Sequence, residues 1–301
     1  MKSQGLLRLL PSPGNNKTGW PWTGETNTSK YLDDIVYPKI SVVTISYNQA
    51  KYLEDAILSV LNQNYPNLEY FVIDGGSTDG SIEIIKKYSD RLTYWCSEKD
   101  NGPASALNKG FSKATGDIFY YLNSDDVLLP NIFFEVVKFI DKNSNYDVYY
   151  GHGFTTRGSL EEKYPVFSMK WDLNQYRLGA VSIFQQSTFI RSNAFRKING
   201  FNERNTTHWD GELLVDLELI EAKFKRFNIF TAIFRIYPES ITGNDKTTFK
   251  YLEERKEVEK RILSIKSLSN TPKILIQISQ LFKDPLITFK RLIFRNIYPY
   301  S

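Results

Sequence analysis

The sequence predicts an α/β fold in which helices cover a mostly parallel sheet. Strand-like and helix-like segments alternate four times in about a hundred residues, as expected where helices connect parallel strands. Each of the four expected strands ends in polar residues. Hydrophobic residues make up 41% of the 301 residues and aromatic residues 15%, which is enough for a sizeable core.

Four short apolar runs are expected to form the strands: residues 39–46, 68–74, 92–98 and 117–123. The first, KISVVTIS, is an almost continuous β-branched run, which is typical of a strand buried on both faces. Helices are expected at residues 51–63, 80–90 and 103–114 and from about Asn131. The first helix has one apolar stripe, spaced i, i+3, i+4, i+7 and i+8: Leu53, Ala56, Ile57, Val60 and Leu61.

The pattern is weaker after Tyr150, and residues 151–184 show none that can be interpreted. A strand, a short helix and a turn are expected in residues 184–201, a helix near Asp210 and a strand at residues 227–237. The expected organisation is an irregular leader at 1–37, a domain at 38–245 and a basic amphipathic helical extension at 246–301. Two tryptophans, Trp20 and Trp22, are expected to hold the leader on the domain surface.

Composition favours a cytoplasmic protein. The single cysteine, Cys96, allows no disulfide within the chain, and a reducing compartment is the simpler interpretation. No apolar run is long enough to span a membrane, and the apolar part of the N-terminus is too short for a secretory signal. The net charge is +4, but residues 246–301 alone carry 12 basic and 5 acidic residues, so the rest carries −3. The body of the chain therefore lacks the charge pattern of a nucleic-acid-binding protein.

The extension combines apolar and basic residues. The stretch TPKILIQISQLFKDPLITFKRLIFRN, residues 271–296, predicts a basic amphipathic helix suited to the inner face of a cell membrane. The alternative is that this segment packs on its own domain or across a homodimer.

The polar strand ends point to a ligand site. They read TISYN, IDGGSTDG, SEKDNGP and NSDD, and ligands of open α/β sheets bind beyond the carboxyl ends of the strands. Neither glycine-rich phosphate motif is present. An acidic edge instead suits Mg²⁺ or Mn²⁺ bridging to a diphosphate, with Asp125 as the ligand. The alternative is that Asp125 and Asp126 cap the helix near Asn131 or form a solvated turn.

Two longer stretches carry a resemblance to a known family. PKISVVTISYNQAKYLEDAILSVLNQNYPNLEYFVIDGGSTDGS and DNGPASALNKGFSKATGDIFYYLNSDD resemble the family 2 glycosyltransferases over about residues 38–245. The resemblance implies the GT-A fold and hexosyl transfer, usually inverting and with Mn²⁺ or Mg²⁺. It also implies a nucleotide diphosphate sugar donor (UDP or GDP favoured), a glycan or lipid-linked acceptor, and a place in cell-surface polysaccharide biosynthesis.

The resemblance assigns roles to particular residues. Asp125 matches the metal ligand, and Asp74 matches the carboxylate that binds the nucleotide base, although a loop-stabilising turn is the alternative for Asp74 and the preferred interpretation for Asp79. The expected nucleotide-binding residues are Thr44, Ser46, Tyr47, Asp74, Asn101 and Asn123, with Asp100 and Lys109 flanking the donor. Lys109 fits a solvated helix face equally well.

Asp210 matches the general base, and Glu212 is the reserve candidate. Without the resemblance, Asp210 is simply a good residue for a helix N-terminus. Further candidates are Asp126 near the metal, Gln186 and Arg191 on the acceptor side, and Arg235, Ser240 and Thr242 at the phosphates. His152 and His208 are expected to be structural or on the acceptor side.

Two departures from the family favour a rival, non-catalytic interpretation. Asn123 stands at the first aspartate of the Asp-x-Asp region, and Tyr237 stands where many relatives have a histidine. Both changes weaken metal binding, as expected for a nucleotide-sugar or carbohydrate binding protein on a decayed scaffold. Asp74, Asp125 and Asp210 favour catalysis. The sugar, the nucleotide and the acceptor are left open.

Overall fold

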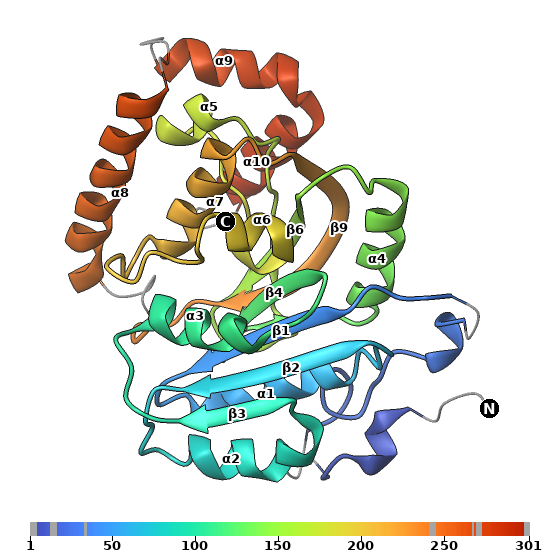
Figure 1. The fold of residues 1–301 in the computed structure, drawn as a ribbon. Coiled ribbons are helices and arrows are strands. Elements are labelled where there is room, and N and C mark those ends of the chain that lie inside the picture. The colour runs from blue at the N-terminus through green and yellow to red at the C-terminus, as the bar shows by residue number, and fades with distance from the viewer. Residues whose placement is uncertain are drawn as a thin grey trace. The chain divides into compact units, whose positions relative to one another are not determined.

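The structure is a computed structural model that describes residues 5–12, 17–32, 35–240, 245–266, 268 and 273–297 (Figure 1). The chain forms two compact units, residues 1–146 with 189–203 and residues 147–188 with 204–301. These boundaries differ from the expected ones near residues 37 and 245, and the expected division remains a prediction.

The first unit contains the predicted parallel sheet. Strands β1 (Ile40–Ser46), β2 (Leu68–Asp74), β3 (Tyr94–Ser97) and β4 (Ile118–Asn123) run parallel in the order β3-β2-β1-β4. The short strand β8 (Phe189–Arg191) pairs antiparallel with β4. The register places Ser46 beside Asp74, Asp74 beside Ser97 and Ile45 beside Asn123. All four carboxyl ends therefore lie at one edge.

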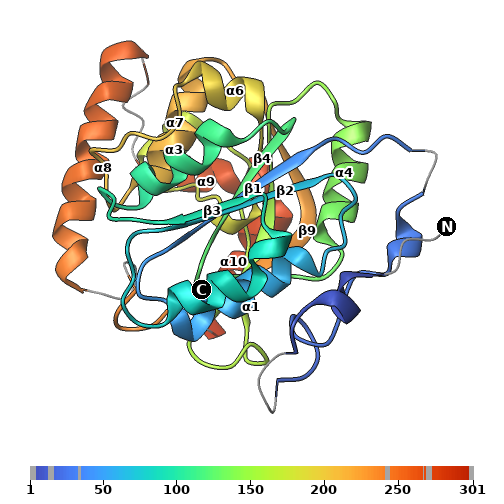
Figure 2. The same ribbon diagram turned by 60° about the horizontal axis from the view of Figure 1, so that its bottom comes forward.

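Helices cover both faces of this sheet (Figure 2). Helices α1 (Ala50–Leu61) and α2 (Ser81–Tyr88) lie on one face and α3 (Pro103–Lys113) on the other. The switch follows from right-handed crossovers, because the chain moves from β1 outward to β3 and then returns to β4 on the other side of β1. Gly110 lets α3 approach closely, since a Cβ there would lie 2.5 Å from a methyl group of Val43.

The remaining elements of this unit are shorter or lie nearer its ends. They are β5 (Val127–Leu128), α4 (Ile132–Lys142), α6 (Ser192–Lys197) and 3₁₀ helices at Leu6–Leu9, Thr28–Lys30 and Ser89–Arg91. The expected tryptophan contacts of the leader are confirmed. The indole N–H of Trp20 donates to the carbonyl of Leu128 (2.7 Å), and that of Trp22 donates to the Asp55 carboxylate (2.6 Å).

The second unit is built on strands that the sequence only partly predicts. β6 (Val148–Thr156) pairs parallel with β9 (Phe224–Arg235) and antiparallel with β7 (Tyr164–Val166). Its helices are α5 (Leu173–Arg177), α7 (Trp209–Leu219), α8 (Asp245–Ile265), α9 (Lys273–Lys283) and α10 (Pro285–Ile297), with a 3₁₀ helix at Gln185–Ser187. Irregular register near His152 breaks the regular alternation of β6. Among the residues described, no helix has the length and apolar character needed to cross a bilayer.

Two apolar clusters hold the C-terminal helices to the second unit. Leu173 and Val215 pack with Val258 and Ile262 of α8. Phe167, Met169 and Val181 pack with Ile287 of α10. The extension is thus part of a packed unit over these residues.

Candidate active site

The loops that follow the strands of the first unit continue the hydrogen bonding of the sheet. The N–H of Gly75 donates to the carbonyl of Ser46 (2.8 Å), and the N–H of Ser124 donates to that of Ile45 (3.2 Å). The side chains of Asp100 and Tyr47 both lie close to Gly75. A Cβ at this position would be 2.9 Å from Oδ2 of Asp100 and 3.3 Å from the ring of Tyr47, so only glycine leaves room for both. The Tyr47 side chain is 64% exposed. A ring and a carboxylate thus meet at the edge of the sheet across one glycine.

Asp74 is engaged inside the protein rather than presented to a ligand. Its fully buried carboxylate accepts hydrogen bonds from the N–H groups of Gly76 (3.1 Å) and Ser77 (2.8 Å) and from the hydroxyls of Ser77 (2.5 Å) and Ser97 (2.6 Å). A carboxylate has about four acceptor sites, so little capacity is left for a base. The structure therefore favours the loop-stabilising alternative over the expected base contact.

Asp79 has the expected turn role. It accepts hydrogen bonds from the N–H of Ala50 (2.9 Å) and from the N–H (3.1 Å) and hydroxyl (2.6 Å) of Ser81. Although burial acts in the opposite direction, these bonds lower the pKa of Asp79. The side chain joins the starts of α1 and α2.

Two residues on the same face of β1 differ in a way that bears on ligand binding. The hydroxyl of Thr44 is buried and bonded to the hydroxyl of Tyr70 (3.0 Å), so the expected nucleotide contact of Thr44 is not favoured. Within the described part of the chain, the hydroxyl of Ser46 and Oδ1 of Asn123 are buried without a hydrogen-bond partner. Such unpaired groups cost about 1–3 kcal/mol each, which a polar ligand at this edge would offset.

Asp125 and Asp126 occupy different environments after β4. Asp125 is half-exposed, whereas Asp126 is fully buried and donates its N–H to the carbonyl of Asn123 (3.1 Å). The expected cap of α4 is provided by another residue, since Oε1 of Gln63 accepts from the N–H groups of Ile132 (2.8 Å) and Phe133 (3.4 Å). The capping alternative is therefore wrong for these N–H groups.

The donor set near Asp125 fits a metal that takes most of its ligands from elsewhere. No group of three histidine, cysteine or carboxylate side chains gathers in the described ranges. Two half-exposed carboxylates, of Asp100 and Asp125, and the unpaired amide oxygen of Asn123 lie at this edge. Mg²⁺ and Mn²⁺ often use one or two protein oxygens and complete their shell with phosphate and water.

The other expected donor residues lie at the surface of the first unit. Asn101 is exposed in the turn before α3, where the N–H of Gly102 donates to Asp100 (2.8 Å). Lys109 forms an exposed ion pair with Glu98 (2.5 Å), which agrees with the solvated-face alternative. Arg191 donates to the carbonyls of Tyr146 (3.0 Å) and Ser144 (2.9 Å). These bonds favour a structural role for Arg191 over an acceptor contact.

Asp210 lies in the first turn of α7 in the second unit. Its carboxylate is half-exposed and accepts from the N–H of Gly211 (2.8 Å). Beside it, the hydroxyl of Tyr176 lies 3.2 Å from Nε2 of His208, and the two rings stack. Burial first, and then the negative charge of Asp210, raise the pKa of Tyr176 far above its usual value. Tyr176 could not be found from the sequence, because it lies in residues 151–184, where no pattern can be interpreted.

Glu212 is far less suited to act as a base. It is buried and accepts from the amide of Asn205 (2.6 Å), and it pairs with Arg261 of α8 (3.0 Å). Arg261 also pairs with Asp216 (2.6 Å). Glu212 therefore joins α7 to α8, and its expected reserve role is not favoured.

The remaining candidates of the second unit are mostly buried. Gln186 and Arg235 are each about 5% exposed or less, and Ser240 bonds within its own turn to the carbonyl of Tyr237 (2.7 Å). Thr242 lies outside the described residues. His152 is a core residue, with Nε2 3.1 Å from the Asn228 amide, and burial lowers its pKa to about 4. His152 is thus structural, one of the two roles expected for it.

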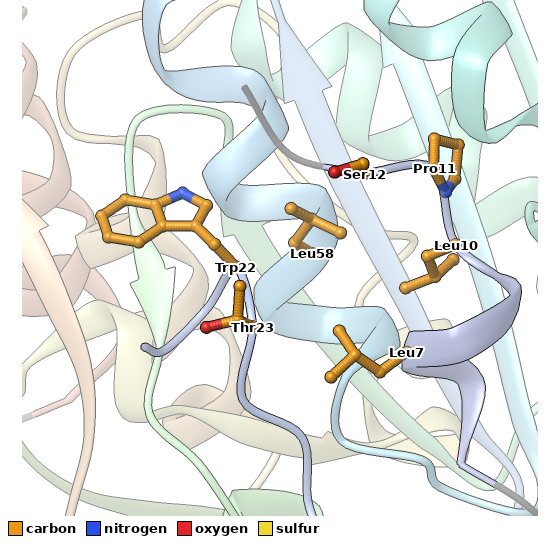
Figure 3. Close-up of a pocket in the computed structure, with 7 residues that line it drawn as sticks. All are labelled: Leu7, Leu10, Pro11, Ser12, Trp22, Thr23 and Leu58. Carbon is orange, nitrogen blue, oxygen red and sulfur yellow. The ribbon is translucent and has the colours of Figure 1, made fainter. Parts of the chain in front are cut away.

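A cavity of about 250 Å³ lies between the leader and α1 (Figure 3). Its lining is mostly apolar and contains none of the expected site residues: Leu7, Leu10, Pro11, Ser12, Trp22, Thr23 and Leu58. It therefore offers no catalytic group, and the strand-end edge remains the candidate donor site.

Solved structures share this fold. The chain superimposes on S. aureus TarS 1-349 in complex with UDP-GlcNAc with a TM-score of 0.63 at 20% identity, covering 82% of this chain and 73% of that one. A mannosyltransferase, PcManGT from Pyrobaculum calidifontis in complex with GDP-Man and Mn²⁺, gives 0.57 at 14% identity, covering 89% and 78%. The fold is that of the GT-A nucleotide-sugar transferases.

Sequence comparison names the family. The model of glycosyl transferase family 2 matches residues 41–199, more than half of the chain, and the chain belongs to that family. An uncharacterized glycosyltransferase of Haemophilus influenzae is 34% identical over 159 residues, 50% of this chain and 64% of that protein. The putative glycosyltransferase EpsE of Bacillus subtilis is 28% identical over 214 residues, 67% of this chain and 74% of that protein. The chain thus spans just under two thirds of the H. influenzae relative.

Proposed function

We propose that the chain transfers a hexose from a nucleotide diphosphate donor to a hydroxyl of a glycan or lipid-linked acceptor, with inversion, in cell-surface polysaccharide biosynthesis. Family membership supports the transferase class. The structural neighbours in complex with UDP-GlcNAc, UDP and GDP-Man support UDP or GDP as the leaving nucleotide. The observation that carries the proposal is the pair of unpaired buried polar atoms, on Ser46 and Asn123, at the strand-end edge.

The donor site is assigned to this edge of the first unit. The exposed ring of Tyr47 offers a surface on which a base can stack, and Asp100 accepts from an N–H of the base or a hydroxyl of the ribose. Ser46 and Asn123 bond the ribose or the diphosphate. In this assignment Asp74 keeps the loop in shape instead of touching the base.

The metal is assigned to Asp125. A bound Mn²⁺ or Mg²⁺ would neutralise charge on the departing nucleoside diphosphate. Asp125 would hold the ion from the protein side, with the amide oxygen of Asn123 as a weak additional ligand. Because one carboxylate binds a divalent ion only loosely, we expect metal and nucleotide to bind together.

The general base is assigned to Asp210. Asp210 lies in the first turn of α7, and its half-exposed carboxylate is accessible to an acceptor hydroxyl. Asp210 would take the proton of that hydroxyl as it attacks the anomeric carbon. The hydroxyl of Tyr176 lies 3.2 Å from Nε2 of His208, the residue that precedes α7.

A thermal-shift panel of UDP, GDP, CDP and dTDP with Mn²⁺, Mg²⁺ or EDTA tests the donor site. At 100 times its dissociation constant, a ligand stabilises the fold by about 2.7 kcal/mol. We expect one diphosphate to stabilise the protein strongly with metal and weakly with EDTA, and Asp125→Asn to abolish the difference. Asp90→Asn, which changes an exposed carboxylate elsewhere in the unit, is the matched control.

The rival function, a non-catalytic binding protein, predicts a different set of results. It rests on Asn123 and Tyr237, the two departures from the family pattern. A diphosphate that binds equally well with EDTA, together with no release of nucleotide from any UDP or GDP sugar, would favour it. No shift with any nucleotide would refute the donor site itself.

A further inference from the structure

Helix α8 contacts the loop that leads into α7, the helix that carries Asp210. Oε1 of Glu254 on α8 accepts hydrogen bonds from the N–H (3.0 Å) and the hydroxyl (3.2 Å) of Thr206. Oε2 of Glu254 accepts from the N–H (2.8 Å) and the hydroxyl (2.5 Å) of Thr207, just before α7 begins. These four bonds are called the Glu254 clamp. The family match covers residues 41–199 and so includes neither side of this contact.

The clamp uses the acceptor capacity of one whole carboxylate. A carboxylate has about four acceptor sites, and each oxygen of Glu254 binds two donors. Burial acts against the charged form, but the bonds from Thr207 and Thr206 lower the pKa of Glu254, so the ionised carboxylate is the form that binds. A glutamine at this position would keep one acceptor oxygen and could serve only one of the two threonines.

Helix α8 does not depend on the clamp for its own attachment. Val258 and Ile262 of α8 pack with Val215 of α7, and Arg261 pairs with Asp216 (2.6 Å). These contacts lie farther along α8 and hold it to the body of α7. The clamp instead fixes the backbone that precedes the first turn of α7.

The position of the Asp210 carboxylate depends on that backbone. Among the residues described, its one hydrogen bond comes from the N–H of the next residue, Gly211 (2.8 Å). The backbone at Gly211 is itself closely packed, since a Cβ there would lie 2.1 Å from the hydroxyl of Tyr176 and 2.2 Å from the ring of His208. The path of the chain from Thr206 to Gly211 therefore sets where the carboxylate lies.

We propose that Glu254 is a positioning residue for the transfer reaction: through Thr206 and Thr207 it holds the first turn of α7 so that Asp210 reaches the acceptor hydroxyl. The proposal rests on the proposed function, in which Asp210 is the general base. A displacement of about 1 Å in a reacting group can cost about 10²-fold in rate, and the clamp restrains the loop on which this group depends. Glu254 acts through the backbone and takes no proton itself.

Single-turnover kinetics tests the proposal, with the donor that the thermal-shift panel identifies. Glu254→Gln breaks the bonds to one threonine, and Thr207→Val removes one hydroxyl from the loop side. Glu253→Gln, which changes the exposed neighbouring carboxylate on α8, is the matched control. We expect turnover per folded molecule to fall about 10- to 100-fold in Glu254→Gln and about threefold in Thr207→Val. Nucleotide diphosphate affinity should stay unchanged in both, and the control should match the natural chain.

The double variant Asp210→Asn/Glu254→Gln shows whether Glu254 acts through Asp210. Residues that act as a unit have non-additive effects on rate. The double variant should therefore be no more than about twofold slower than Asp210→Asn alone. Additive losses, or full turnover in both Glu254→Gln and Thr207→Val, would overturn the proposal.

Hydrogen exchange separates the failure of this proposal from the failure of the proposed function. The amides of residues 206–212 should exchange faster in Glu254→Gln than in Glu253→Gln, whether or not the chain transfers a sugar. Equal exchange would refute the clamp while leaving the transferase assignment intact. Full turnover in Asp210→Asn would refute the assigned base, and the positioning role with it, even if the exchange rates differed.

Discussion

The strand-end edge of the first unit and the start of α7 in the second unit both carry carboxylates in two different environments. Each region carries a buried carboxylate whose oxygens are engaged within the protein and a half-exposed carboxylate. At the edge these are Asp74 and Asp125, and on α7 they are Glu212 and Asp210. In both regions we expect the buried carboxylate to stabilise the fold and the half-exposed one to take part in the reaction.

The difference between the buried and the half-exposed carboxylates teaches that residue type and position in the sequence do not by themselves identify a functional carboxylate. Asp74 sits at a strand end and Glu212 at a helix start, as catalytic groups often do. Their burial is what separates them from Asp125 and Asp210, which are half-exposed. The comparison predicts that exposed members affect turnover and buried members affect stability.

The largest effect is expected at Asp210. Asp210→Asn removes the proposed base and should lower turnover by about 10²- to 10⁴-fold, while the affinity for the nucleotide diphosphate stays unchanged. Single-turnover kinetics with the donor found in the panel measures the first quantity, and isothermal titration measures the second.

Glu212→Gln is the internal control for that experiment. It weakens the pairing of α7 with Arg261, so it should lower the free energy of unfolding by about 1.5–3 kcal/mol without changing turnover per folded molecule. If Glu212→Gln lost turnover while Asp210→Asn kept it, the two roles would be exchanged and the comparison would be broken.

Asp74→Asn should chiefly cost stability. An amide nitrogen would face donors that now bond the carboxylate, and hydrogen bonds to charged groups contribute about 1.5–3 kcal/mol. We expect a loss of about 3 kcal/mol in urea unfolding. A stable Asp74→Asn variant that had lost selectivity for its nucleotide base would restore the base contact that the resemblance implied.

Asp216, a third carboxylate on α7, allows the role of a buried carboxylate in stability to be tested by changing the pH. Burial raises the pKa of Asp216 from 3.8 to about 6, against the opposing charge of Arg261. The pKa of Asp216 is higher in the folded state than in the unfolded state. Asp216 therefore stabilises the folded state below about pH 4, and this contribution to the free energy of unfolding is lost as the pH rises through about 6. Two pKa units correspond to at most about 3 kcal/mol, and partial exposure reduces this to about 2 kcal/mol.

Urea unfolding of Asp216→Asn and the natural chain at several pH values isolates this contribution. Relative to the natural chain, the variant should gain about 2 kcal/mol between pH 4 and pH 7. A difference that stays constant with pH would mean that Asp216 keeps an ordinary pKa beside Arg261.

The sequence predicted the first unit well because its physical signals are local. Strands buried on both faces have continuous β-branched runs, and β2 begins and ends as expected, at Leu68 and Asp74. Crossover helices have apolar stripes, and Leu53 and Val60 in the predicted stripe of α1 are buried. These signals predicted the mostly parallel sheet and the edge that carries the polar residues.

The second unit and the state of each site residue could not be predicted in this way. Strand β6 contains two glycines and irregular register around His152, which hide its alternation. Whether a polar side chain is free or engaged depends on distant partners, such as Tyr70 for Thr44 or Gln63 for the start of α4. No sequence spacing encodes those contacts.

The smallest and most selective prediction uses two hydroxyls on one face of β1. Ser46→Ala removes a buried hydroxyl that has no partner among the described residues, so the free energy of unfolding should stay the same or rise slightly. If that hydroxyl bonds the donor, nucleotide affinity should fall about fivefold, the worth of roughly 1 kcal/mol. Thr44→Val should do the opposite, because it leaves the hydroxyl of Tyr70 unpaired: stability falls by about 1 kcal/mol and affinity is unchanged. Equal behaviour of the two variants in both assays would show that the unpaired hydroxyl does not mark the donor site.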